Sequence, residues 1–277
     1  MPETQEDDMS ERNLATAAAV GRNDNRCEWR PKPKRPHCKC ISTDQPPKRP
    51  DPAIYSQRQR LSQGLSTSWE SPDIQTNWWD DWRFMDSIQI RVHNESNEAS
   101  AVNTLVQVRW APFGIGTMFS ALGDQMISLG YAPDARDMAF PINDAVRALG
   151  NDLSIEVSIS HPHDKVADNN LGYQAIHGVR TSQLGRSPSM QFAVLNATAA
   201  TETITLVVLA NDIGGTVTPA SRVFAPGEQI TATLTTNVPA AIVPPAGDFI
   251  LKEATVVGYD SGGRLLGGVT LLVRVDS

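Results

Sequence analysis

The residue types best suited to chemistry gather in the stretch SHPHDKVADNN, residues 160–170. His161 and His163 are two positions apart, and a strand would place both rings on one side, as in the HxH pairs of metal-dependent hydrolases. That hydrolase pattern continues with Asp and His two and three residues after the second His, whereas Asp164 follows His163 at once and position 166 holds a valine. We therefore do not assign a metal site here.

A turn explains the same stretch. Ser160 closes an alternating apolar run, and Pro162 has no backbone N–H to give to a strand ladder. The side chains of residues 168–170, Asp-Asn-Asn, hydrogen-bond readily to their own backbone and tolerate the left-handed conformation. The stretch is predicted to be a loop that joins two strands.

A second cluster, CEWRPKPKRPHCKC, contains Cys27, His37, Cys38 and Cys40. Three thiolates and an imidazole would suffice in number for tetrahedral zinc, but the usual pair of CxxC knuckles is missing. A disulfide from Cys27 to Cys38 or Cys40, or three reduced thiols, are the alternatives that the sequence leaves open. We expect no cofactor.

Tryptophans concentrate in NWWDDW, at Trp78, Trp79 and Trp82. Exposed rings beside carboxylates would suit a carbohydrate, whose faces stack on aromatic side chains. The alternative, which we prefer, is that these rings cap the end of a sandwich or bury against a neighbouring chain. Asp80 and Asp81 are adjacent, so on a strand they would point to opposite faces and could not act together on one bond.

Composition and motifs favour a non-enzymatic protein. The sequence contains no GxSxG, HExxH, P-loop or strand–helix GxGxxG signature. With 277 residues, 40% hydrophobic and 20% charged, the chain is long enough for two domains, and it has no apolar run of membrane-spanning length. Its first residues are acidic where an export signal would be basic, so we expect a cytoplasmic protein or a component of a particle or surface assembly exported another way.

Charge divides the chain into a basic arm and an acidic body. Residues 22–60 contain 11 Lys and Arg against 4 Asp and Glu, whereas residues 69–277 contain 12 against 22. Seven prolines between Pro31 and Pro52 predict an extended or disordered arm over residues 1–68. The acidic body would repel nucleic acid, so we expect the arm to contact neighbouring protein subunits instead. Its partner-binding residues would be Arg30, Lys32, Lys34, Arg35 and Lys39.

Alternating apolar residues after residue 69 indicate an all-β fold. Ile88, Ile90 and Val92 alternate with polar neighbours, and LSIEVSIS, residues 153–160, repeats the pattern. Such strands at short spacing predict two tandem immunoglobulin-like β-sandwiches, residues 69–182 and 183–277. Short helical turns are expected within residues 116–130 or 142–150.

The two halves also resemble each other. IQIRVHNESNEASAVNTLVQVRWA and MQFAVLNATAATETITLVVLA both read as strand, loop headed by Asn, strand. The succession ESPDI, IRVHNESNEASAVNTLVQVRWAPFG and SIEVSISHPHDKVADNNLGYQAI resembles CARDB-type, immunoglobulin-like bacterial modules over residues 69–180. Residues 188–277 resemble only a generic immunoglobulin-like sandwich. The resemblance implies a fold and supplies no catalytic residues.

These observations lead to one functional expectation and one alternative. We expect a structural or adhesion-type subunit that assembles with neighbouring chains, as a homo-oligomer or a larger assembly, through its arm and sandwich surfaces. The alternative is a carbohydrate-binding module that uses the tryptophan patch.

Overall fold

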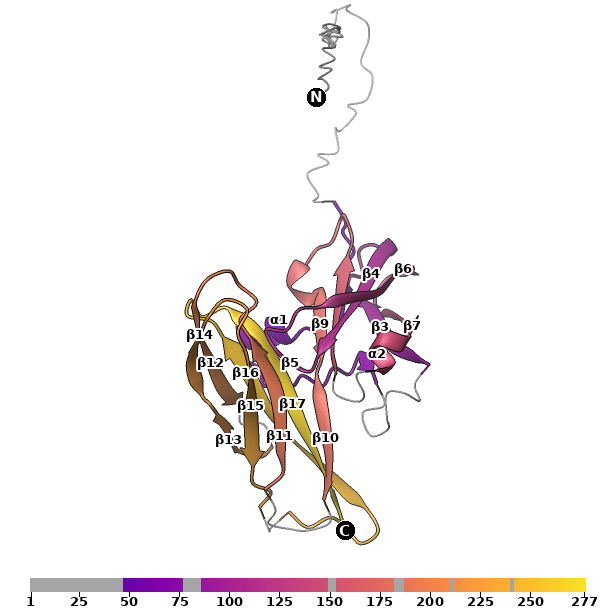
Figure 1. The fold of residues 1–277 in the computed structure, drawn as a ribbon. Helices are drawn as coiled ribbons and strands as arrows, with labels where there is room; N and C mark the ends of the chain where they lie inside the picture. The colour runs from indigo at the N-terminus through magenta and orange to yellow at the C-terminus, as the bar shows by residue number, and fades with distance from the viewer. Residues whose placement is uncertain (1–46, 77–85, 149–152, 182–186, 210–211, 240–241) are drawn as a thin grey trace, which may run out of the picture. The chain divides into compact units, whose positions relative to one another are not determined.

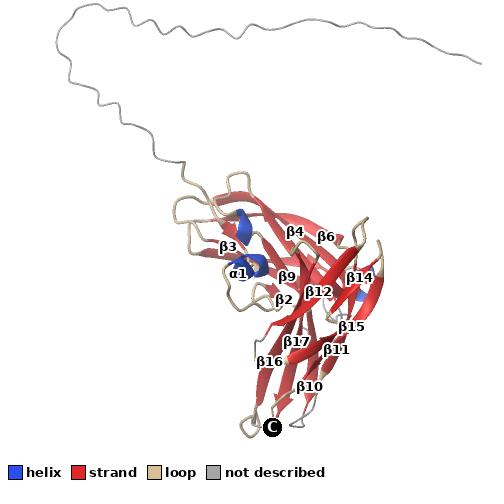
Figure 2. Cartoon of the chain, turned by 90° about the vertical axis from the view of Figure 1, so that its left-hand side faces the viewer, coloured by secondary structure: helices blue, strands red, loops and turns tan. Residues whose placement is uncertain are grey.

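The computed structural model describes residues 47–76, 86–148, 153–181, 187–209, 212–239 and 242–277. The chain divides into two units, Met1–Gln45 and Pro46–Ser277, and the described part of the second unit is called the body. Strands make up most of the body, as Figure 2 shows in red. The fold is therefore all-β, as predicted.

Two β-sheets form the N-terminal sheet pair. The first sheet has the strand order β1 (Pro52–Ala53), β3 (Ser87–Asn94), β2 (Ile74–Gln75), and β7 (Asp134–Pro141) also pairs with β3. The second sheet has the strand order β6 (Ser120–Leu129), β4 (Ala101–Pro112), β8 (Leu153–Ser160), β9 (Leu171–Gln174). Their facing sides bury one hydrophobic cluster.

The alternating pattern explains this N-terminal cluster. Ile88, Ile90 and Val92 of β3 are fully buried, while the residues between them are exposed or half-buried. On β8 the apolar positions 153, 155, 157 and 159 are buried as predicted. Side chains on a strand point alternately to its two faces, so each strand contributes one apolar face to the space between the sheets.

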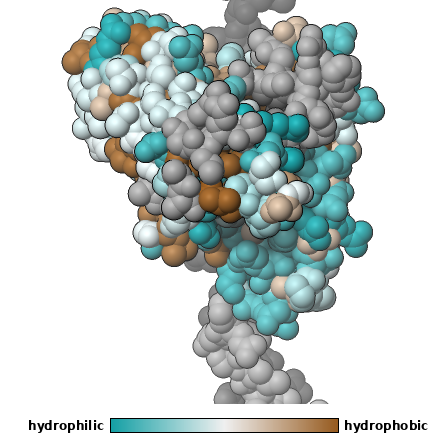
Figure 3. Space-filling model, turned by 90° about the horizontal axis from the view of Figure 1, so that it is seen from below, coloured by the Kyte–Doolittle hydropathy of each residue, from teal (hydrophilic) through white to brown (hydrophobic). Residues whose placement is uncertain are grey.

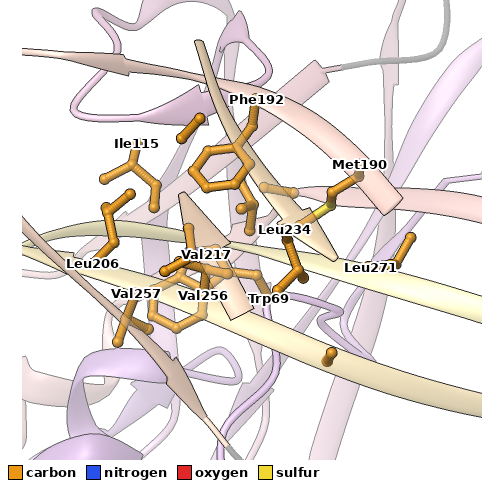
Figure 4. Packing of buried hydrophobic residues seen from close by; sticks show 14 of the residues in the cluster. Trp69, Ile115, Met190, Phe192, Leu206, Val217, Leu234, Val256, Val257 and Leu271 are labelled. Carbon is orange, nitrogen blue, oxygen red and sulfur yellow. The ribbon is translucent and has the colours of Figure 1, made fainter. Parts of the chain in front are cut away.

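The C-terminal sheet pair has the same layered construction (Figure 1). In pairing order its sheets are β13 (Gly215–Thr218), β15 (Gln229–Thr236), β11 (Ser189–Leu195) and β5 (Gly114–Ile115), and β10 (Ile176–Thr181), β17 (Leu265–Asp276), β16 (Phe249–Tyr259), β12 (Glu202–Leu209) and β14 (Ser221–Phe224). Figure 4 shows Phe192 and Leu234 of the first sheet in the same cluster as Leu206, Val256 and Leu271 of the second.

Segments from earlier in the chain complete the C-terminal sheet pair. The short strand β5 pairs with β11, and β10 pairs with β17 in parallel over six residues. The predicted boundary at residues 182 and 183 is therefore not a boundary between sheets, because β10 ends before it and already belongs to the C-terminal pair.

Trp69 joins the C-terminal cluster as well. Its side chain is 1% exposed, and its backbone N–H donates to Thr270 Oγ1 at 2.8 Å. A Cβ at Gly268 would meet the Trp69 ring at 2.6 Å, so only glycine lets the indole lie this close to β17. The residue predicted to open the first sandwich thus packs on the last strand of the chain.

The internal resemblance of the two halves has a structural counterpart. Asn94 ends β3 and its side chain accepts from Ser96 N–H at 3.1 Å and donates to Ala99 O at 2.9 Å. Asn196 follows β11 and does the same with Thr198 N–H at 3.0 Å and Ala200 O at 2.8 Å. A buried Asn therefore holds the turn after the strand in both halves.

Of the two helical turns considered in the sequence, one is wrong and one is confirmed. Residues 120–129 form strand β6 rather than a helical turn, because β4 pairs with them along nearly its whole length. The other predicted turn exists as α2 (Asp144–Arg147), capped by the Asn143 side chain on Val146 N–H.

Residues 47–68, predicted as part of the arm, belong to the body. They form β1 and α1 (Gln57–Ser62), and Ile54 is buried in the N-terminal cluster. Ser56 caps α1 by accepting from Gln59 N–H at 3.4 Å. The prolines near β1 are compatible with folding because this strand pairs through only two residues at a sheet edge.

Hydrophobic residues also reach the surface of the body, and Figure 3 shows some of them between hydrophilic and neutral residues. On the outer side of β12, β14 and β16, four apolar side chains are 39–59% exposed: Val207, Val223, Phe249 and Leu251. No helix in the described ranges is long and apolar enough to cross a membrane.

Candidate functional site

Most residues that the sequence marked for function lie outside the described residues. These are Cys27, His37, Cys38 and Cys40, the basic residues Arg30, Lys32, Lys34, Arg35 and Lys39, and Trp78, Trp79 and Trp82. Their predicted roles remain predictions.

His161 and His163 lie in a loop between β8 and β9, as the sequence predicted. His163 N–H donates to His161 Nδ1 at 3.1 Å, and His161 Nε2 lies 3.1 Å from Val102 O. Asp164 Oδ1 accepts from Val166 N–H at 3.2 Å, and its other oxygen accepts from the side chain of Asn170. These side chains hold the loop backbone together. Among the residues that the structure describes, no three His, Cys, Asp or Glu side chains gather as metal ligands would.

The body contains a cleft where the two sheet pairs meet, with a volume of about 330 Å³. Side chains from α1, β8, β9 and the β5–β6 segment line one side, and those from the β11–β12 turn, β12 and the β16–β17 turn line the other. The lining residues used below are Arg58, Thr117, Phe119, Glu156, Tyr173, Asn196, Glu202, Asp260 and Arg264.

Helix α1 is fixed to β9 at the edge of this cleft. Gln57 is fully buried, and its carboxamide donates to Tyr173 O at 2.7 Å and accepts from Tyr173 N–H at 2.9 Å. The side chain thus takes the place of a neighbouring strand for one residue of β9. Because Arg58 follows Gln57 directly, this contact fixes the position of the Arg58 backbone at the edge of the cleft.

On the N-terminal side of the cleft, a buried carboxylate is paired. Glu156 is 7% exposed and accepts from Arg109 Nε at 2.8 Å. The Arg109 guanidinium lies over the Phe119 ring, 5.7 Å from its centre, and Phe119 and Tyr173 are 6.3 Å apart. Burial, with a smaller contribution from Glu156, raises the pKa of the Tyr173 hydroxyl, so this group stays protonated at neutral pH.

On the C-terminal side the polar groups are also paired. Asp260 accepts from Arg264 Nε at 2.9 Å and from the N–H groups of Gly262 and Arg264, and these bonds lower the pKa of its carboxyl. Glu202 accepts from Ser261 Oγ at 2.7 Å. The three carboxylates of the cleft therefore all have donors.

Two other polar side chains line the cleft, those of Thr117 and Arg58. The Thr117 hydroxyl is buried and has no hydrogen-bond partner within the described structure. Arg58 is exposed, and no described residue forms an ion pair or hydrogen bond with its guanidinium. It lines the cleft, and its positive charge opposes the rise in the pKa of Tyr173.

Sequence reasoning did not find this cleft. Its walls come from residues 58 to 266, and no short motif links them. The only local signal was the capped helix start at Ser56, which would have brought Arg58 into the folded body.

No protein-family model and no curated protein matches the chain. Among solved structures, it is similar to SSP-19, an MSP-domain protein like family member in Caenorhabditis elegans, at 12% identity and TM-score 0.24, over 33% of this chain and 88% of that one. It is similar to Escherichia coli alpha-2-macroglobulin at 9% identity and TM-score 0.26, over 84% of this chain and only 22% of that one. The CupB6 tip adhesin of Pseudomonas aeruginosa matches at 7% identity and TM-score 0.22, over 68% and 89%. At such scores these likenesses carry no functional argument.

Proposed function

We propose that the chain is a non-enzymatic structural or adhesion-type subunit that assembles with neighbouring copies through its basic N-terminal residues and its β-sandwich surfaces. Its body would be two immunoglobulin-like sandwiches in tandem, of the kind that CARDB-type modules have. One observation carries the proposal: residues 22–46 contain 7 Lys and Arg against 3 Asp and Glu, whereas residues 47–277 contain 16 against 23. Opposite charges on one chain attract between copies.

The body offers a surface for such contacts. Val207, Val223, Phe249 and Leu251 expose apolar area on the outer side of one C-terminal sheet. Exposed apolar groups surrounded by polar ones are typical of protein interfaces. In the cleft, Glu156 and Asp260 accept hydrogen bonds from Arg109 and Arg264, and such pairs support the structure around them.

Light scattering after size-exclusion chromatography tests this proposal on the full chain and on residues 47–277. We expect a larger species for the full chain, which salt dissociates, and a monomer for the shorter one. A matched pair of variants assigns the effect: replacing Arg30, Lys32, Lys34, Arg35 and Lys39 by Gln should abolish association, whereas replacing the acidic Glu3, Glu6, Asp7, Asp8 and Glu11 by Gln should not. The same number of chains per particle for the full and the shortened protein would exclude the proposal.

The tryptophan-rich patch motivates the second candidate, a carbohydrate-binding module. Three tryptophans within NWWDDW are dense enough to form a stacking platform. A glycan screen with Trp79→Ala tests it. Binding that this variant removes, with unchanged thermal stability, would favour the module over the assembly role.

A further inference from the structure

The sheet formed by β13, β15, β11 and β5 contains no charged residue in any of its strands. Each of the other three sheets of the body has charged residues in its strands, for example Arg91 in β3, Glu156 in β8 and Glu253 in β16. In a chain in which 20% of the residues are charged, a sheet with a solvent-facing side and no charge is unusual. This sheet can therefore meet another molecule without the cost of removing water from a charge.

The outward side of this sheet, here called the neutral face, presents hydroxyl and amide groups. Inward residues such as Phe192 and Leu234 are buried in the C-terminal cluster, so the residues between them point outward. Thr216 lies opposite Thr235, and Thr218 lies opposite Thr233. The exposed and half-buried polar side chains of the neutral face are those of Ser189, Gln191, Thr216, Thr218, Gln229, Thr231, Thr233 and Thr235.

A groove of about 450 Å³ borders the neutral face and has no charged residue either. Its lining consists of Ser187, Gly214, Gly215, Thr216, Thr235, Thr236 and Asn237. Within the described residues, the side chains of the neutral face form no hydrogen bond or ion pair. Hydroxyl and carboxamide groups both donate and accept hydrogen bonds, so both kinds of capacity are open to another molecule.

The chemistry of the neutral face selects the kind of partner. Nucleic acid is held mainly by Lys and Arg, sugar rings stack on aromatic side chains, and a charged protein surface needs opposite charges. The neutral face has none of these groups. Side chains that both donate and accept are complementary to themselves, as a two-fold contact between identical subunits requires.

The charge of the body also favours a second copy at this face. Residues 47–277 contain 16 Lys and Arg against 23 Asp and Glu, so two bodies repel each other on approach. Of the four sheets, only this one can meet its copy without placing charged strand residues against each other.

We propose that the neutral face is a contact surface for a second copy of the chain, related to the first by a two-fold axis. The proposal deepens the assembly function proposed above and rests on it. The face has fewer residues than the roughly 20–30 per partner of a stable interface, so the contact is weak by itself. It adds to the contact made by the basic N-terminal residues, which is consistent with the monomer expected for residues 47–277.

Dilution of the isotope-labelled full chain at high ionic strength, followed through amide chemical shifts, tests the proposal. High salt screens the charge contacts of the N-terminal residues and leaves a neutral contact in place. We expect shifts that depend on protein concentration at the amides of β11, β13 and β15, and constant shifts at the amides of β3 and β7.

A matched pair of variants locates the contact. Thr233→Glu should weaken the self-association about tenfold or more, because a carboxylate would be buried without a cation partner. Thr205→Glu is the control: Thr205 is exposed on β12 of the other sheet of the pair, so the same substitution there should leave the association unchanged. Thermal unfolding checks that both variants fold, and Thr231→Glu, on the same strand and face, replaces Thr233→Glu if that variant is unfolded.

Three results would overturn the proposal: shifts that do not change with concentration, changes confined to other strands, and an equal effect of the substitutions at positions 233 and 205. Failure of the assembly function has a different signature. It appears in light scattering at low salt, as the same number of chains per particle for the full chain and for residues 47–277.

Discussion

The two sheet pairs use the same turn but complete their cores differently. In both, a buried Asn, Asn94 or Asn196, holds the turn after a strand. The N-terminal cluster draws all its buried residues from positions 54–159, whereas the C-terminal cluster includes Trp69, Phe113 and Ile115 from much earlier in the chain. A repeated strand–turn–strand unit therefore does not make the C-terminal pair an independent unit.

The comparison is tested most severely by cutting the chain. A fragment of residues 187–277 lacks Trp69, β5 and β10, so β17 loses the strand that pairs with it over six residues. We expect no cooperative unfolding transition for this fragment in urea, followed by circular dichroism, and a cooperative one for residues 47–277. A fragment as stable as the longer chain would show that the C-terminal pair is autonomous.

Removal of the Trp69 ring should have the next largest effect. Trp69 is 1% exposed, and Trp69→Ala should lower the free energy of unfolding by about 3–5 kcal/mol through lost burial and the cavity left behind. Trp110→Ala is the matched control, because Trp110 is only half-buried at the N-terminal cluster and should cost less. Urea denaturation of both variants measures the difference, and equal costs would contradict the role assigned to Trp69.

Gly268→Ala should act through the same contact with a smaller effect. The new methyl would lie 2.6 Å from the Trp69 ring, and such overpacking costs about 1–3 kcal/mol. Gly214→Ala is the control, since a Cβ at position 214 would have no atom within 4 Å and its cost should be near zero. Thermal unfolding measures both variants, and an equal shift of the melting temperature in Gly268→Ala and Gly214→Ala would contradict the account.

The smallest expected effect is a pH-dependent change in stability that arises in the N-terminal sheet pair. A hydrogen bond from His93 to Asp73 at 2.8 Å raises the pKa of His93 above 6.5. A raised pKa means that the stabilisation is fully present below pH 6.5 and is lost as the pH rises through the folded-state value. His93→Gln should therefore destabilise the protein more in mildly acidic than in mildly basic buffer, by less than about 1 kcal/mol because the ring is partly exposed. Unfolding free energies at both pH values measure this, and a pH-independent cost would contradict it.

The strands that face a single core could be predicted from the sequence, and β6 could not. Alternation at Ile88, Ile90 and Val92 reports a strand with one buried face. In β6 the apolar residues are spaced as on one face of a helix, yet Met126 is 58% exposed. Hydrogen bonding to β4, rather than burial of an apolar face, determines that this segment is a strand.

The cleft could not be predicted from the sequence, for a related reason. The prolines and basic residues before Arg58 predict an extended arm, and the buried residue beside it, Gln57, is polar, so no apolar pattern marks this segment as folded. Glu156 and Tyr173 lie on predicted strands, but they line one cleft with the β16–β17 turn only because of how the sheet pairs meet. The periodicity of a single strand does not reveal that arrangement. Contacts between residues far apart in the chain thus set both the cleft and the C-terminal core.

Native-state hydrogen exchange on residues 47–277, compared between the unsubstituted chain and Trp69→Ala, tests the dependence of the C-terminal pair on earlier segments most directly. The account predicts faster exchange at the amides of β16 and β17, with β3 and β8 much less affected. Unchanged protection in β16 and β17, or an equal loss in both sheet pairs, would contradict it.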